Sequence, residues 1–306
     1  MPHRPNLAAA ADATRESVYE VAGKAANWGL SVNLLLVAVK LAGSVITGSA
    51  ALLADAVNSI GDVASAIVLR GALYVAQRDE DAEHPYGHTK AESIGGLSVA
   101  LLIVLSAAAL LLETIRSFAA DQTLMKLTAG IIAAVCAITK ECTYRYVNRV
   151  ATDLMSASLQ ASALDHRSDA IGSAVVAGAL LVSPVFGDYS RFVDPVAAIF
   201  VCGYLIHAGV RMYINIAEEL MDKQADEAFV IRVRQIAVEV RNVTDVEKLR
   251  VRKSGLEYFV EIHIQVDGNL TVSDGHRIGH DVKDELMKEV PRLRDVHVHI
   301  EPFDGA

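Results

Sequence analysis

The sequence predicts an all-α six-helix transmembrane bundle followed by a small α+β domain. Three observations support this fold class. Hydrophobic residues make up 52% of the 306 residues, and the mean hydropathy is positive, as in membrane proteins. Six apolar segments are long enough to cross a bilayer, and the charged residues are concentrated near the C-terminus.

The six apolar segments form the expected bundle, which we assign to residues 28–222. They lie at residues 28–47, 50–77, 93–117, 124–147, 157–183 and 194–219. About 20 apolar residues in a helix cross the hydrocarbon core. Helices are expected because lipid offers no partner to an unpaired backbone. The frequent Gly, Ala and Ser residues allow these helices to pack closely.

Basic residues mark one side of the expected bundle. They precede the first span and lie between the second and third and between the fourth and fifth; they are Arg4, Arg15, Lys24, Arg78, Lys90, Arg145 and Arg149. Short loops rich in Lys and Arg stay in the cytoplasm. We therefore place both termini there, with an N-terminal segment at 1–27 and a C-terminal domain at 223–306.

The C-terminal domain is predicted from its charge and its periodicity. It contains 13 of the 28 Lys and Arg and 16 of the 37 Asp and Glu. Helical spacing occurs in DEAFVIRVRQIAVEVRNV and SDGHRIGHDVKDELMKEVP, and alternation occurs in VEKLRVRKSG, EYFVEIHIQVD and DVHVHIEP. The order α, β, β, α, β predicts an open sheet with helices on one face. The net charge of −9 comes without a basic stripe, so no nucleic acid partner is predicted.

Two of the apolar segments carry polar residues at the same spacing. The second contains Asn58 and Asp62, in ADAVNSIGD, and the fifth contains Asp165 and Asp169, in LDHRSD. Residues four apart share a face of a helix, so these pairs can close a four-ligand site. A charge at bilayer depth costs roughly 3 kcal/mol or more, and a divalent cation would neutralise it. The alternative is that the acids pair with Lys40, Arg70, Lys140 or Arg167 and hold the helices together.

Such a site can also exchange metal for protons. Carboxylate ligands bind protons in competition with metal, so the same groups can couple metal release to proton uptake. Asp55 lies on the same stripe as Asn58 and Asp62. It belongs either to the access path around the site or to a helix-packing contact.

Two further groups have metal-ligand chemistry. In the loop after the second span, Asp81, His84 and His88 have metal-ligand spacing, and the alternative is a solvated polar loop. In the C-terminal domain, the candidates are Glu247, His263, His276, His280, His297, His299 and Glu301. They suggest a metal-sensing or dimer-bridging cluster, with His280 and His297 its weaker members, and the alternative is ordinary surface histidines.

Several motifs together resemble the cation diffusion facilitator family, in the family's order. They are SAALLADAVNSIGD, DAEHPYGHTKAES, LDHRSDAIGS, FVDP and ELMD. The resemblance implies a ferredoxin-like (metallochaperone-like) C-terminal domain and a homodimer in a bacterial inner membrane. It also implies export of divalent cations in exchange for protons, by alternating access, and no enzymatic activity.

The resemblance also assigns roles to individual residues. It implies a transport site at Asn58, Asp62, Asp165 and Asp169, a loop site at Asp81, His84 and His88, and a C-terminal binuclear site at Glu247, His263, His276, His299 and Glu301. Lys90 and Asp222 match a charge interlock that holds helices together at the dimer contact.

The ligand set of the transport site predicts the metal. Zinc-transporting members usually have His or Asp in place of Asn58 and His in place of Asp165. Here the set is Asn, Asp, Asp, Asp, as in the manganese-exporting branch, and oxygen ligands suit Mn²⁺ whereas imidazole favours Zn²⁺. We predict Mn²⁺ as the substrate, with Zn²⁺ and Fe²⁺ as alternatives.

Two other function classes are less consistent with the residues. An intramembrane phosphoalcohol transferase needs a glycine and an arginine between its aspartates, and neither ADAVNSIGD nor LDHRSDAIG fits that pattern. A metal-sensing scaffold would use the membrane part only as an anchor. The matched polar pairs in two spans argue against a passive anchor.

Overall fold

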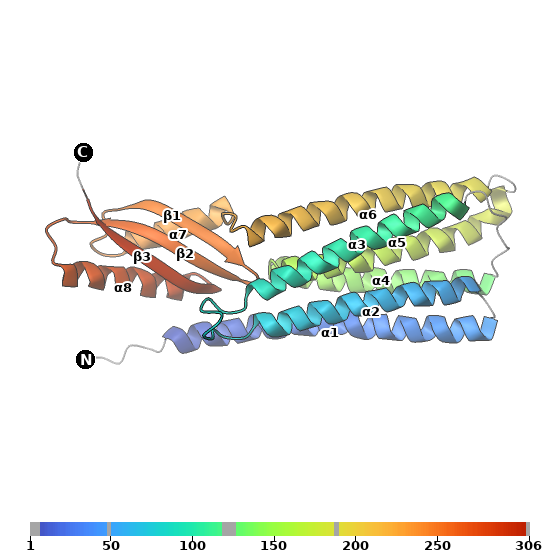
Figure 1. Cartoon of the computed structure of the whole chain (residues 1–306), viewed down its shortest axis with the longest axis horizontal. Coiled ribbons are helices and arrows are strands. Elements are labelled where there is room, and N and C mark those ends of the chain that lie inside the picture. The colour runs from blue at the N-terminus through green and yellow to red at the C-terminus, as the bar shows by residue number, and fades with distance from the viewer. Residues whose placement is uncertain (1–6, 48–49, 118–126, 187–189, 304–306) are drawn as a thin grey trace. The chain divides into compact units, whose positions relative to one another are not determined.

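The computed structural model describes residues 7–47, 50–117, 127–186 and 190–303. The first part of the chain forms six long helices (Figure 1), which are α1 (Leu7–Thr47), α2 (Ala50–Ala76), α3 (Lys90–Ser117), α4 (Leu127–Asp153), α5 (Ala157–Phe186) and α6 (Ser190–Leu220). Each matches one expected span, but α1 begins well before residue 28 and α4 continues past residue 147. Helix α1 therefore includes most of the segment assigned to residues 1–27.

Three helices in the described ranges are long and apolar enough by themselves to cross a membrane. They do so over Arg15–Gly43, Ser59–Ala76 and Lys90–Arg116. Helices α4 and α5 carry charged residues within their length, including Lys140 and Glu141 on α4 and Asp165 and Asp169 on α5. The finding covers only described residues, and side chains in parts of α4, α5 and α6 are not among them. The prediction that all six helices span the bilayer is therefore not tested by this finding.

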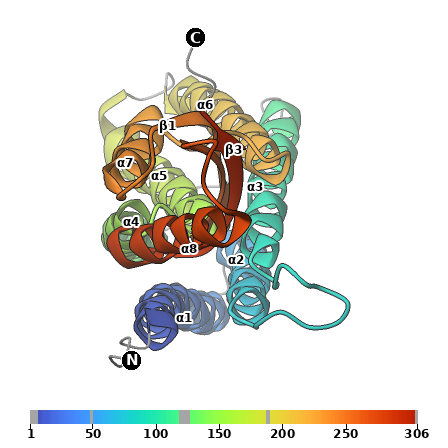
Figure 2. The same cartoon turned by 90° about the vertical axis from the view of Figure 1, so that its left-hand side faces the viewer.

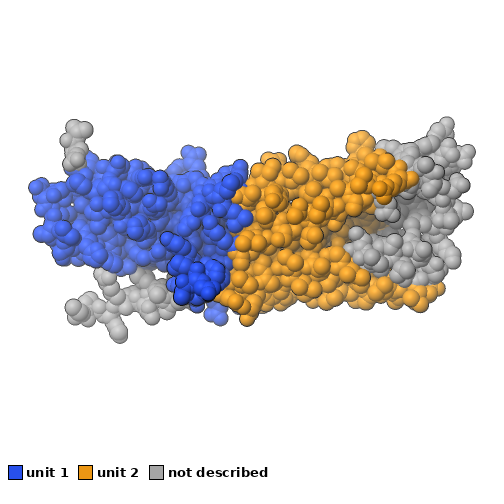
Figure 3. Space-filling view, viewed as in Figure 1, with its two compact units in different colours: residues 1–20, 79–90, 218–306 blue, residues 21–78, 91–217 orange. Residues whose placement is uncertain are grey.

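The chain divides into two compact units, which Figure 3 colours separately. Unit 1 comprises 1–20, 79–90 and 218–306, and unit 2 comprises 21–78 and 91–217. Large apolar side chains are exposed on unit 2, among them Leu34, Leu35, Leu105 and Ile138. An apolar surface of this kind is expected for helices that face lipid.

Small residues bring the helices of unit 2 close together. A Cβ atom on Gly95 of α3 would lie 2.3 Å from Cβ of Ala72 on α2, and one on Gly96 would lie 2.9 Å from the Cα atom of Ser158 on α5. Only glycine allows these approaches. The close packing positions α2 and α5, which carry the acidic pairs.

A buried carboxylate fixes the start of α5. The side chain of Glu92, on α3, accepts hydrogen bonds from the Ser156 hydroxyl at 2.6 Å, the Ser158 amide at 3.0 Å and the Ser158 hydroxyl at 2.7 Å. The N-terminus of a helix has unpaired N–H groups and a partial positive charge. Glu92 accepts from one of these N–H groups and places a negative charge at this end, while the Ser156 hydroxyl accepts from the Leu159 amide, so together they fix the start of the helix with Asp165 and Asp169.

The C-terminal part has the predicted element order. It consists of α7 (Glu227–Glu239), β1 (Asp245–Ser254), β2 (Glu257–Val266), α8 (Val272–Glu289) and β3 (Leu293–Pro302). The sheet order is β1-β2-β3, with β2 antiparallel to β1 and parallel to β3. The α8 helix begins at a Thr271 cap, whose side chain accepts a hydrogen bond from the Asp274 amide, the usual role of Thr there.

Both helices of this domain cover the same face of its sheet (Figure 2). Alternate residues of β2, including Ile262 and Ile264, are fully buried in one core with Val233 of α7 and Val282 of α8. Because side chains alternate along a strand, His263 lies on the opposite face. The predicted α+β character and the placement of the helices on one face are confirmed.

The close approach of α2 and α3 predicts different outcomes for two glycines. Gly95→Ala should destabilise the protein by about 1–3 kcal/mol, because the added methyl group overlaps Ala72. Gly71→Ala is the matched control on α2, since a Cβ there meets nothing within 4 Å. It should have no effect or a stabilising one. Thermal unfolding of the purified protein distinguishes them, and equal stability of the two variants would contradict this packing.

Candidate metal centres

Three of the four residues predicted for the transport site lie together. Asp62 on α2 and Asp165 and Asp169 on α5 each offer a carboxylate oxygen, and these atoms all lie within 4.8 Å of one another. Asp62 is only 9% exposed. Asn58 lies one turn before Asp62 on α2, but its side chain, like that of Asp55, is outside the described part of the structure. The arrangement offers oxygen donors, which suit hard divalent cations.

A lysine lies among these carboxylates. Lys140 of α4 donates hydrogen bonds to Asp169 at 2.5 Å and to Asp62 at 3.1 Å. It also donates to the side-chain oxygen of Asn33, on α1, at 2.9 Å. The sequence suggested Lys140 as one of four possible ion-pair partners, and the structure selects it for Asp62 and Asp169.

Asn33 was missed in the sequence analysis. Its amide nitrogen donates to the backbone oxygen of Asp62 at 3.1 Å, and it is 1% exposed. In the sequence, Asn33 is marked only as a single amide inside the apolar run SVNLLLVAVK. Polar side chains within membrane helices usually face a partner or a cavity, but no spacing rule indicates which partner.

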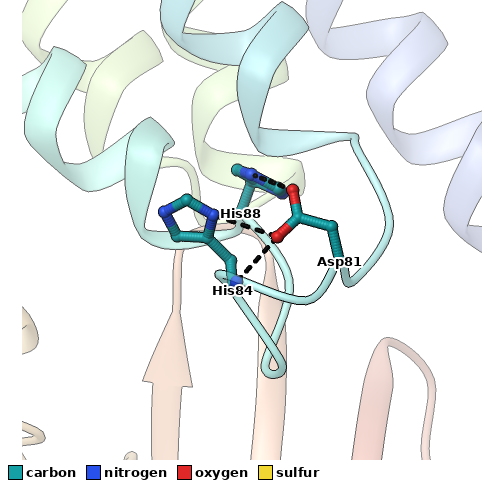
Figure 4. A group of neighbouring side chains, drawn as sticks. All are labelled: Asp81, His84 and His88. Atoms are coloured by element: carbon teal, nitrogen blue, oxygen red, sulfur yellow. Dashed lines mark hydrogen bonds and ion pairs between the residues drawn. The ribbon is translucent and has the colours of Figure 1, made fainter.

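The loop site is assembled by a turn (Figure 4). One Asp81 oxygen accepts a hydrogen bond from the His84 amide at 2.7 Å and lies 3.2 Å from His84 Nδ1, and the other lies 3.4 Å from His88 Nε2. The chain turns at Gly87, whose φ of 78° favours glycine. The three predicted residues therefore lie together, with His88 the least exposed.

Backbone hydrogen bonding favours the ionised form of Asp81. The bond from the His84 amide lowers the pKa of Asp81 below its ordinary value of 3.8. Because the folded-state pKa is depressed, the stabilisation of this turn by Asp81 is complete above the ordinary pKa. It is lost as the pH falls through the lowered value. The carboxylate is thus available to a cation at neutral pH.

The loop is held at both ends within unit 1. Asp79 forms an ion pair with Arg15 at 2.6 Å, and Glu80 forms one with Arg294 of β3. After the histidines, the hydroxyl of Thr89 hydrogen-bonds the hydroxyl of Ser254 at 2.7 Å, and both residues are buried. These bonds restrict the loop, so that its three candidate ligands keep their positions.

The sheet brings together three residues of the predicted C-terminal site. His263 on β2 pairs with His299 on β3 in the parallel register, and their rings are 4.8 Å apart. Glu301 lies 2.7 Å from His263 Nδ1 and 3.5 Å from His299 Nε2. Their candidate ligand atoms lie within 4.8 Å of one another, on the sheet face opposite the helices.

Glu247 and His276 are not part of this group in the described single chain. Glu247 falls at an irregularity between Val246 and Lys248 in the β1–β2 register. His276 lies on α8, which packs on the other face of the sheet, and its Nε2 is 3.1 Å from Nε2 of His280. One protomer therefore supplies three of the five predicted residues to one place.

The two residues of the expected interlock meet. Lys90, at the start of α3, is 3.1 Å from Asp222, and Arg252 of β1 is 2.9 Å from the same Asp222 oxygen. Asp222 has a positive φ of 60°, a conformation that Asp tolerates better than most residues. The carboxylate therefore joins the start of α3 to β1.

Comparisons with known proteins agree over nearly the whole chain. A family model described as the cation efflux transmembrane domain matches residues 28–221, and one described as the cytoplasmic domain of cation efflux proteins matches 225–303. The chain is 25% identical to the manganese efflux system protein MneP of Bacillus subtilis, over 93% of this chain and 97% of that protein.

Two further relatives are similar over most of their length. Metal tolerance protein 2 of Oryza sativa is 28% identical, over 92% of this chain and 79% of that protein. The magnetosome protein MamB of Magnetospirillum gryphiswaldense is 28% identical, over 91% of this chain and 93% of that protein.

The strand geometry predicts which C-terminal residues bind metal. Asp169→Asn first removes one carboxylate of the separate cluster formed with Asp62 and Asp165. In that background, Glu301→Gln should weaken Zn²⁺ binding roughly tenfold or more, because Glu301 contacts both His263 and His299. His297→Ala is the control, since His297 lies two residues before His299 on the same face of β3, pairs with Glu261, and is not one of the three grouped residues. Calorimetric titration of the intact protein measures both. Equal loss of affinity in the two variants would contradict the assignment.

Proposed function

This chain belongs to the cation efflux family, and we propose that it exports Mn²⁺ from the cytoplasm in exchange for protons. Members of the family are membrane transporters of metal ions and not enzymes. The further steps concern the metal, the coupling ion and the residues. All three depend on the three carboxylates of α2 and α5.

The observation that carries the proposal is the buried cluster of Asp62, Asp165 and Asp169. Carboxylates this close repel one another strongly unless cations or protons neutralise them. A divalent cation is the natural occupant, and protons are its competitors for the same oxygens. Alternating access, with the site open to either side in turn, would convert this competition into exchange.

The choice of Mn²⁺ rests on ligand chemistry. Asn58 and Asp165 would offer oxygens where zinc-transporting relatives often have imidazole, and oxygen ligands suit Mn²⁺ better. The name of one relative, the manganese efflux system protein MneP, supports the same metal. Zn²⁺ and Fe²⁺ are the second candidates, since Zn²⁺ binds more tightly than Mn²⁺ at most sites.

We further propose that the protein acts as a homodimer in the inner membrane, with both termini in the cytoplasm. The match of residues 225–303 to the cytoplasmic domain of cation efflux proteins supports the placement of the C-terminal domain. In this arrangement the cluster of His263, His299 and Glu301 would be a regulatory metal site. Asp81, His84 and His88 would bind a cation at the cytoplasmic side, and Lys90 with Asp222 would fix the helix ends.

Flux measurements in proteoliposomes test the function. Mn²⁺, Zn²⁺ and Fe²⁺ uptake are compared with and without a pH gradient that drives protons out of the lumen. Faster Mn²⁺ uptake with the gradient than without it is the expected result. A transport rate that ignores the gradient would contradict proton exchange, and Zn²⁺ transport without Mn²⁺ transport would contradict the choice of metal.

Loss of a transport carboxylate should stop the flux. Asp62→Asn and Asp169→Asn are each expected to reduce Mn²⁺ uptake by roughly two orders of magnitude or more, since each removes a charged ligand. Asp153→Asn, at the exposed end of α4, is the matched control and should transport normally. Transport that persists in both ligand variants would exclude this cluster as the site.

A histidine in place of Asn58 or Asp165 should change the selectivity between metals. Asn58→His and Asp165→His should each raise the ratio of Zn²⁺ to Mn²⁺ uptake by roughly tenfold, because imidazole favours Zn²⁺ over Mn²⁺. The ratio is measured with both metals present at equal concentration. An unchanged ratio in both variants would contradict the hard-ligand argument, whichever metal the wild-type protein prefers.

A further inference from the structure

Lys140 lies among the carboxylates proposed to bind the substrate cation, although a positively charged side chain would repel that cation. Its side chain is 2% exposed. Its ammonium nitrogen is within hydrogen-bond distance of Asp62 on α2 and Asp169 on α5 at the same time. The ammonium therefore lies between two carboxylates from different helices.

The ammonium and a substrate cation need the same oxygens. The oxygens of Asp62, Asp165 and Asp169 lie within 4.8 Å of one another, and a hard cation binds oxygens at about 2.0–2.6 Å. Such a cation would therefore lie between the carboxylates that Lys140 now joins. Two positive charges so close together repel strongly away from water. The ammonium must therefore withdraw before the cation can bind.

Asn33 offers the ammonium a third acceptor. The Asn33 amide nitrogen donates to the backbone oxygen of Asp62 at 3.1 Å, and its oxygen accepts from Lys140 at 2.9 Å. The first bond orients the side chain so that the oxygen faces the ammonium. This acceptor is uncharged and is not one of the three carboxylates. Lys140 can keep it while releasing both Asp62 and Asp169.

We propose that Lys140 is a built-in counter-ion of the transport site, which joins Asp62 and Asp169 when the site is empty and keeps only its bond to Asn33 when a divalent cation enters. This rests on the proposed assignment of these carboxylates as transport ligands. The ammonium then lowers the affinity of the site for metal. By returning to the carboxylates it also helps to release the cation, so Lys140 positions the ligands without coordinating metal.

Removal of the ammonium should tighten metal binding. Lys140→Met, of similar length and uncharged, is expected to lower the Kd for Mn²⁺ at least tenfold, because nothing competes for the carboxylates. It should also unfold at a lower temperature than the wild type without metal, and regain more stability when Mn²⁺ is added. Lys40→Met is the matched control: Lys40 is also buried, but its ammonium donates to the Ser59 hydroxyl at 2.8 Å.

Loss of the Asn33 acceptor should act in the opposite direction. Asn33→Ala leaves the ammonium with two carboxylates in the empty site but with no retained acceptor once metal binds. The Kd for Mn²⁺ should therefore rise about tenfold, the value of a hydrogen bond to a charged group. Opposite changes in Lys140→Met and Asn33→Ala cannot come from a general loss of fold.

Titration calorimetry and thermal unfolding of the intact purified protein give these values. A Lys140→Met protein with unchanged or weaker Mn²⁺ binding, equally destabilised with and without metal, would show that Lys140 is only a structural bridge. If that variant does not fold, Asn33→Ala decides: weaker binding supports the proposal and unchanged binding overturns it.

Asp169→Asn separates the two proposals. If it abolishes tight Mn²⁺ binding while Lys140→Met leaves the Kd unchanged, only the counter-ion role fails. If Asp169→Asn binds Mn²⁺ as tightly as the wild type, the transport site itself is wrongly assigned.

Discussion

The compensation of buried charge is the constraint on which the membrane part of this protein depends. Three carboxylates lie within one small volume formed by α2 and α5. Lys140 from α4 and Asn33 from α1 complete the polar group. Removing one partner of a buried ion pair typically costs about 3–5 kcal/mol, so four helices are held in place by the same group that would bind the substrate. Stability therefore favours the ion pairs of Lys140 with Asp62 and Asp169, whereas binding of a cation would require these pairs to break.

Much of the fold and of the candidate sites could be predicted from sequence, because helix spacing, strand alternation and turns depend on residues close together in the chain. The four-residue spacing of Asp165 and Asp169 fixes their common face on one helix, and alternation along the last strand places His299 and Glu301 together. The helix and strand order of the C-terminal domain follows from its periodicity in the same way. The loop cluster was also accessible, because Asp81, His84 and His88 are close in sequence and a turn at Gly87 brings them together.

The features that could not be predicted from sequence depend on tertiary packing. The sequence offered four basic residues as partners for the acids, and only the packing of α4 against α5 selects Lys140. Asn33 is a single amide in an apolar run, and no periodicity connects it to a residue on another helix. Likewise, His276 and His263 both belong to the histidine-rich domain, but α8 and the cluster lie on opposite faces of the sheet. The side chain of Asn58 lies outside the described residues, so its place among the ligands remains a prediction.

In the proposed cycle, a substrate cation and the Lys140 ammonium occupy the same carboxylates in turn. A crystal structure of the protein soaked with Mn²⁺, with anomalous diffraction recorded at the manganese absorption edge, tests it most directly. The account predicts an anomalous peak among Asp62, Asp165 and Asp169, with the Lys140 ammonium beyond hydrogen-bond distance of both Asp62 and Asp169 and still bonded to Asn33. A structure with Mn²⁺ bound only elsewhere, and with Lys140 still joining the two carboxylates at saturating metal, would contradict it.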